Sequence, residues 1–139
     1  MKFYNPFKTI AIASLMSLAL PVSVSADDET PLGEQMDTMS SAYKKLRKAK
    51  TTKEKVELMR TAQKATLKSL EYLPMIFKDI KDEAEKAKAT ADYKKLTGQL
   101  FVKWCELEIA FMAEDQDKAD EIIGQIKDLK KEGHEKYTE

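Results

Sequence analysis

Two side chains of this chain have the chemistry to bind an iron from opposite sides. His134 is the only histidine in the sequence, and Met36 lies almost a hundred residues before it. An imidazole and a thioether can fill both axial positions of a haem iron, and methionine opposite histidine raises the reduction potential. With both positions filled, oxygen binding and activation are disfavoured. If the fold brings Met36 and His134 together, the pair predicts a site for electron transfer rather than catalysis.

Other kinds of site lack the residues they need. A single histidine and the single cysteine, Cys105, cannot build the usual structural zinc site, and the sequence contains no Glu-x-x-His motif for a di-iron centre. Without a C-x-x-C-H motif, covalent attachment of haem through that motif is excluded. We therefore expect no catalytic residues, and any haem at this site would be held non-covalently. A peroxidase-like enzyme, one alternative, would need the axial position that Met36 occupies.

The N-terminus has the pattern of a secretory signal peptide. It carries Lys2 and Lys8, an apolar run from Ile10 to Leu20, and small residues up to Ala26. We expect residues 1–26 to be removed. Residues 27–139 are then long enough for one domain, and none of their segments is apolar enough to span a membrane.

Charge excludes some partners. Basic and acidic residues balance in the whole chain, and the predicted signal peptide contains two lysines and no acidic residue. The remaining chain is therefore slightly acidic, which argues against nucleic-acid binding and gives no polybasic surface for anionic membranes.

Hydrophobic periodicity predicts four helices, with few glycines and prolines to interrupt them. We expect the first near residues 31–49. A capping box of Thr51 and Glu54 should begin the second, which Pro74 should stop. The third should span about 85–112, and the fourth should begin at the acidic residues 114–117. The residues expected to face inward are, from the first helix to the fourth, Leu32, Met36, Met39, Tyr43 and Leu46; Val56, Met59 and Leu67; Tyr93, Leu96, Leu100, Trp104, Leu107 and Phe111; and Ala119, Ile122, Ile126, Leu129 and Tyr137.

Four helices with short connections pack most simply as an all-α, up-down-up-down antiparallel four-helix bundle. The start of the first helix, the end of the fourth and the connection between the second and third then lie at one end. This topology brings Met36 and His134 to the same end, with the Leu73–Phe77 stretch as an apolar wall beside them. The simpler interpretation stays open: methionine often fills gaps in a core, and a cation near a helix C-terminus is favoured in any case.

The sequence from residue 27 to the C-terminus resembles the cytochrome b562 family. The resemblance is most specific at Leu32-Gly33-Glu34-Gln35-Met36 and at His134-Glu135-Lys136-Tyr137. It implies a periplasmic electron carrier with haem b, with Met36 and His134 as the axial ligands and redox proteins as partners. A haem-free periplasmic binding or stress protein on the same scaffold is the alternative.

Three positions near His134 depart from the family pattern. The family has arginines one turn before and one turn after the histidine, where this chain has Lys130 and Thr138. Gly133 replaces an aromatic residue and should loosen the last helical turn by about 1 kcal/mol. These changes bear on how firmly haem is held and on how its propionates are paired, but not on the fold.

The third predicted helix is apolar on a second side. Phe101, Val102, Cys105, Ile109 and Met112 lie about 80–180° around from its inward face. This surface is either a flank of the core or a homodimer face with the unpaired cysteine at its centre.

Overall fold

The computed structural model describes residues 30–138. The expected signal peptide and its cleavage site lie outside these residues. None of the described helices is both long and apolar enough to cross a membrane.

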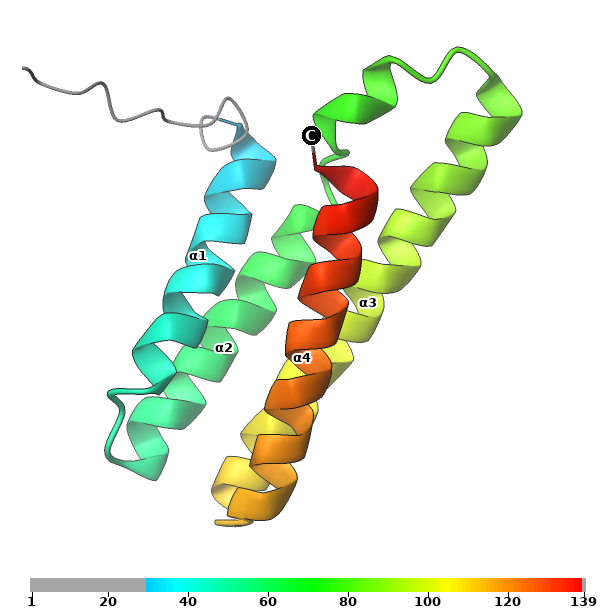
Figure 1. The fold of residues 1–139 in the computed structure, drawn as a ribbon. Helices are drawn as coiled ribbons and strands as arrows, with labels where there is room; N and C mark the ends of the chain where they lie inside the picture. Colours follow the sequence, from blue (N-terminus) through cyan, green and yellow to red (C-terminus); the bar gives the residue numbers. More distant parts are fainter. Residues whose placement is uncertain (1–29, 139) are drawn as a thin grey trace, which may run out of the picture.

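The described residues form four α-helices and no strands. Consecutive helices run in opposite directions and pack against each other, which confirms the predicted all-α four-helix bundle (Figure 1). The predicted connection between the second and third helices contains one short 3₁₀ helix. The elements are α1 (Pro31–Leu46), α2 (Thr52–Ser69), η1 (Met75–Lys78), α3 (Glu83–Met112) and α4 (Gln116–Tyr137).

Each α-helix begins with a side chain that caps its free backbone donors. The Thr51 hydroxyl accepts a hydrogen bond from the Glu54 backbone N–H, and the Glu54 carboxylate accepts one from the Thr51 N–H. This reciprocal pair confirms the predicted capping box. Thr30, Asp82 and Asp115 cap α1, α3 and α4. In each of these caps, one side-chain oxygen accepts a hydrogen bond from a backbone N–H in the first turn of the helix.

The end of α2 corrects one prediction. The helix ends at Ser69, well before Pro74. Proline restricts only the residue directly before it, and the chain has already left the helix through tight turns. In those turns the N–H groups of Leu70 and Tyr72 donate to the carbonyls of Leu67 and Ser69. Pro74 instead precedes η1 in an extended conformation, and α1 likewise ends slightly earlier than predicted.

The main apolar core fills the half of the bundle that contains the α1–α2 and α3–α4 connections. All four helices contribute to it, and Trp104 and Leu107 of α3 are among its most buried members. The core therefore lies away from the end where α1 begins and α4 finishes. Its members are Ala42, Leu46, Val56, Met59, Ala62, Trp104, Leu107, Ala110, Phe111, Ala119, Ile122 and Ile126.

Two residues that the hydrophobic pattern predicts on inward faces have exposed side chains. The side chain of Leu67 is 50% exposed, because the buried face of α2 continues through Thr66 and Ser69. Leu67 lies one residue beyond Thr66 and so about 100° away from that face. Met36 is also at the surface of α1, at 36% exposed.

Gly133 allows a direct test of packing in the last turns of α4. A Cβ atom there would lie 3.5 Å from Leu96 Cδ2, an ordinary contact, and the glycine does not have a positive φ. We expect Gly133→Ala to raise the free energy of unfolding by about 0.5–1 kcal/mol, because alanine loses less backbone entropy in a helix. Urea denaturation of the apoprotein measures this. Gly124→Ala, where nothing lies within 4 Å, should give a similar gain, and destabilisation by Gly133→Ala alone would mean that the last turns pack more tightly than the structure shows.

Candidate functional site

Met36 lies on the flank of α1 that faces away from α2. The α2 side of α1 is marked by Thr38, which lines a hollow together with Leu58 and Thr61 of α2. Met36 comes two residues before Thr38 and is therefore about 200° around the helix from it. Its thioether is partly exposed on this flank.

Met39, three residues later and about 60° around the helix, is the other methionine in this part of α1, but it is buried. Its side chain is buried, and the Thr66 hydroxyl of α2 lies 2.9 Å from its sulfur. Met39 therefore packs against α2. Of these two thioethers, that of Met36 is the one on the outer flank.

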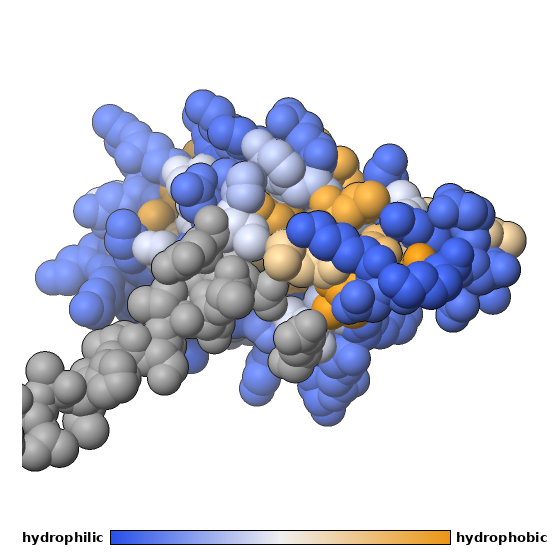
Figure 2. Space-filling model, turned by 90° about the horizontal axis from the view of Figure 1, so that it is seen from above, coloured by the Kyte–Doolittle hydropathy of each residue, from blue (hydrophilic) through white to orange (hydrophobic). Residues whose placement is uncertain are grey.

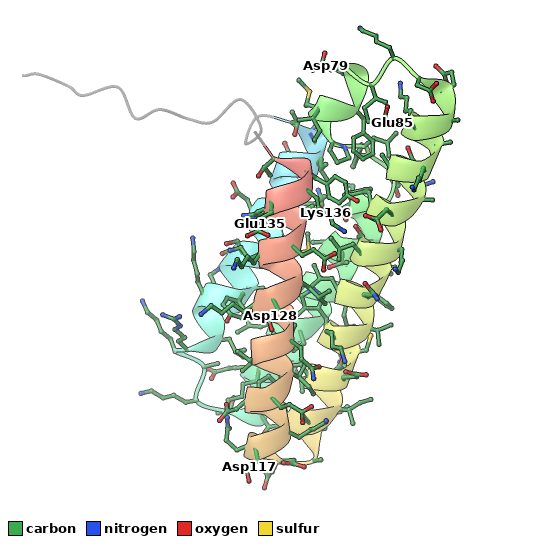
Figure 3. All side chains as sticks on the ribbon, turned by 45° about the vertical axis from the view of Figure 1, so that its right-hand side comes forward. Asp79, Glu85, Asp117, Asp128, Glu135 and Lys136 are labelled. Atoms are coloured by element: carbon green, nitrogen blue, oxygen red, sulfur yellow. The ribbon has the colours of Figure 1, made fainter. Side chains whose placement is uncertain are left out.

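His134 lies on the flank of α4 that faces away from α3. The α3 side of α4 is marked by Lys136, whose Nζ lies 3.2 Å from Asp92 Oδ2; Figure 3 shows Lys136 on that side and Glu135 on the other. His134 precedes Lys136 by two residues and is about 200° around from it. Its side chain is exposed, and no described residue forms a hydrogen bond with the imidazole.

The two flanks lie at the same end of the bundle. Met36 is about 8 Å along the axis from the start of α1, and His134 is about 5 Å from the end of α4. These two helix ends lie at one end of the molecule (Figure 1). In contrast to the consecutive helices, α1 and α4 have scarcely any close backbone approach. Met36 and His134 therefore border the seam at which neighbouring helices pack least closely.

Small polar side chains are buried inside this end of the bundle, beside larger apolar ones. Thr66 and Ser69 of α2 and Thr97 of α3 are the buried polar residues of the described chain. Each hydroxyl donates to a backbone carbonyl within its own helix, at 2.7–2.9 Å. The buried side chains at this end of the bundle therefore include hydroxyl groups as well as the larger Tyr93 and Leu96 of α3.

Three aromatic rings fasten η1 to α3 and α4 at the same end. Phe77, Tyr93 and Tyr137 pack edge to face, with ring centroids 5.5–6.2 Å apart. Of the apolar wall predicted here, Phe77 is buried in this aromatic cluster, while Leu73 and Met75 are exposed. Figure 2 views this end and shows hydrophobic surface surrounded by hydrophilic side chains.

A network around Asp92 ties the end of α4 to α3. The Tyr137 hydroxyl donates to Asp92 Oδ2 at 2.5 Å, and Lys136 bridges Asp92 to Glu132. The Tyr137 hydrogen bond, followed by that of Lys136, holds the pKa of Asp92 below its ordinary value. Burial, followed by the Asp92 hydrogen bond, raises the pKa of Tyr137 to about 12. The tyrosine thus stays protonated and donating, and the carboxylate stays ionised.

The Asp92 network predicts an acid-sensitive contact between α3 and α4. A carboxyl group whose pKa is lowered by folding stabilises the protein above its unfolded pKa, and this contribution is lost as the pH falls through its folded pKa. We expect the wild type to melt above Asp92→Asn at pH 7, and the difference to shrink as the pH falls below the ordinary pKa of an aspartate, about 3.9. Thermal melting followed by circular dichroism at several pH values measures this. A difference that does not change with pH would show that the Asp92 charge contributes nothing.

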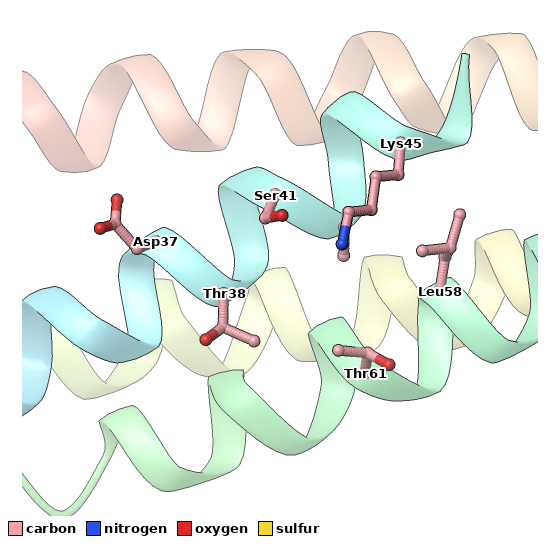
Figure 4. Close-up of a pocket in the computed structure, with 7 residues that line it drawn as sticks. Asp37, Thr38, Ser41, Lys45, Leu58 and Thr61 are labelled. Carbon is pink, nitrogen blue, oxygen red and sulfur yellow. The ribbon is translucent and has the colours of Figure 1, made fainter. Parts of the chain in front are cut away.

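The hollow between α1 and α2 is a different feature. It has a volume of about 460 Å³, is open to solvent, and is lined by Asp37, Thr38, Ser41 and Lys45, among others (Figure 4). Charged and hydroxyl groups on its wall do not suit an apolar ring. Nor do the described residues include a group of three or more His, Cys, Asp or Glu residues that could hold a bare metal ion.

The donor set does fit haem. The porphyrin supplies the four equatorial nitrogens, so the protein needs to provide only axial ligands, and a thioether facing an imidazole is one such pair. The model of the cytochrome b562 family matches residues 31–138. The chain belongs to the cytochrome b562 family. No curated protein and no solved structure matches it in the corresponding comparisons.

Cytochromes b562 bind b-type haem, carry electrons and are not enzymes, and the family is itself an example of the up-down-up-down bundle. Within this family fold, the sequence predicts Met36 and His134 but not the buried polar residues and the ionic contact near them. Thr66, Ser69 and Thr97 interrupt the apolar pattern of their helices, so hydrophobic periodicity does not predict that they are buried. The Asp92–Tyr137 contact joins residues distant in sequence, and no local pattern indicates it.

Proposed function

We propose that the protein is a periplasmic cytochrome in which Met36 and His134 bind haem b non-covalently, and that it passes single electrons between redox proteins. The observation that supports this proposal is that Met36 of α1 and His134 of α4 lie at the same end of the bundle (Figure 1). Bound haem would supply a one-electron couple between ferric and ferrous iron.

The remaining residues of this end would hold and shield the group. The exposed Leu73 and Met75 would be available to cover apolar ring surface. Lys130 lies one turn before His134 on the same flank, and it forms no ion pair with a described residue. We infer that Lys130 pairs with a haem propionate, in the role that the family gives to arginine.

Visible absorption of protein purified from its native compartment tests the proposal. A sharp Soret band, with split bands after reduction, is the expected result. A colourless protein that also fails to take up added haem would refute the proposal and favour the haem-free binding protein on the same scaffold. The compartment is tested separately, by fractionating cells and sequencing the N-terminus of the purified protein.

Haem binding should also raise stability. A ligand that binds only the folded state adds RT ln(1 + [L]/Kd), about 2.7 kcal/mol at a hundredfold excess over Kd. We therefore expect the holoprotein to melt well above the apoprotein in calorimetry. Equal melting temperatures at saturating haem would contradict specific binding to the folded bundle.

A further inference from the structure

The outer side of α3 carries a second apolar stripe that the bundle does not use. Val102 is 50% exposed, and Ile109 and Met112 are more exposed still, while Cys105 is partly buried. We define the outer seam as Gly98, Val102, Cys105, Ile109 and Met112. Its successive spacings are 4, 3, 4 and 3 residues, the heptad pattern of a helix that packs along a partner helix.

The outer seam lies on the opposite side of α3 from the core. Leu107 and Phe111, both buried in the bundle, are about 140–180° around the helix from Val102. Phe101 is half-buried at the margin of the seam. The seam is therefore a separate surface and not a flank of the core. At about 21 Å, it is long enough for four helical turns.

Charges near the two ends of α3 indicate which partner fits. Lys94 and Lys95 are exposed beyond the Gly98 end of the seam, and Glu114 is exposed beyond the Met112 end. An antiparallel second copy of α3 would place the lysines of one chain near the glutamate of the other. A parallel copy would instead place like charges together, which is unfavourable.

Gly98 provides a notch on the same surface. A Cβ atom at this position would have no neighbour within 4 Å, so the backbone there is open to solvent. In the antiparallel arrangement, the bulky Ile109–Met112 end of one seam lies opposite the Gly98 end of the other. The bulky end of each copy thus packs against the Gly98 end of the other, and this contact occurs twice, as a two-fold symmetric interface requires.

We propose that two copies of this protein associate through the outer seams of α3, antiparallel and about a two-fold axis near Cys105. A seam of four turns buries less surface than a permanent dimer needs. The association is therefore concentration-dependent, in the micromolar to millimolar range. It does not depend on haem, because the seam faces away from the core.

Sedimentation of the purified protein over that concentration range, with reductant present, tests the proposal. We expect the mass to rise from one chain towards two, and Val102→Glu and Ile109→Glu each to hold it at one chain. Leu67→Glu is the matched control, because Leu67 is exposed to the same extent as Val102 but lies on α2. A wild type that stays monomeric, or an equal loss with Leu67→Glu, would overturn the proposal.

Charge reversal tests the antiparallel direction. Lys94→Glu should weaken association about tenfold, and adding Glu114→Lys should restore it, because the exchanged charges again attract across the interface. Melting curves that match the wild type confirm that these surface variants are folded. Weakening without recovery in the double variant would overturn the antiparallel arrangement.

Discussion

Replacing His134 by alanine is expected to remove haem from the purified protein while leaving the bundle folded. The imidazole is exposed and bonded to no described residue, so its loss costs the apoprotein little, within about 0.5 kcal/mol. As the stronger of the two proposed axial ligands, it should account for most of the affinity of the iron for the protein. We expect haem affinity to fall at least a hundredfold, which corresponds to about 2.7 kcal/mol.

The measurement is a haem titration of the apoprotein followed at the Soret band, with circular dichroism to verify the fold. Glu135→Ala is the control, since Glu135 is the next residue of α4, is also exposed, and lies on a different side of the helix (Figure 3). Retention of the wild-type spectrum by His134→Ala would exclude His134 as a ligand. An equal loss of haem affinity in both variants would mean that any change at the end of α4 weakens haem binding, and would not support ligation by the imidazole.

The effect of Met36→Ala should differ in kind. Loss of the thioether removes the ligand that favours reduced iron, so the reduction potential should fall and the vacant axial position should bind carbon monoxide. Haem should still be retained through His134. Met112→Ala is the control, because Met112 is also exposed but lies at the C-terminal end of α3, far from Met36. It should leave the reduction potential and the lack of carbon monoxide binding unchanged.

Sequence patterns predicted the bundle because its signals are local. The capping box at Thr51 and the apolar spacing of α3 each need only a few neighbouring residues. Even the position of Met36 and His134 at the same end of the bundle follows from the number of helices and their short connections. The family resemblance then indicated which methionine to pair with the histidine.

What sequence patterns did not predict depends on neighbours in space. Leu67 has an apolar side chain in a helix, but Thr66 and Ser69 take the inward positions, because the buried face of α2 follows helical spacing rather than hydrophobicity. Tyr137 was expected to be inward, yet its hydroxyl partner is Asp92 on another helix. In both cases, polar groups inside the bundle are satisfied by hydrogen bonds that a one-dimensional pattern cannot reveal.

This difference between the two halves of the bundle leads to a prediction about stability. Leu107 is 0% exposed and lies in the main core, whereas Leu67 is half exposed towards the end that contains Met36 and His134. Both were expected to face inward. We expect Leu107→Ala to lower the free energy of unfolding by about 3 kcal/mol, within the usual range of 2–5 for a buried leucine, because the deletion leaves a cavity. Leu67→Ala should cost less than about 1 kcal/mol.

Urea denaturation of the apoproteins measures both changes, and similar slopes would show that the midpoints report stability alone. A loss of about 3 kcal/mol is a large share of the 5–15 kcal/mol typical of a domain. Because Leu107 lies in the half of the bundle away from Met36 and His134, Leu107→Ala should keep the Soret band of the wild type wherever it remains folded. Equal destabilisation by the two substitutions would contradict the arrangement of α2. A changed haem spectrum in Leu107→Ala would mean that the haem lies deeper in the bundle than Met36 and His134.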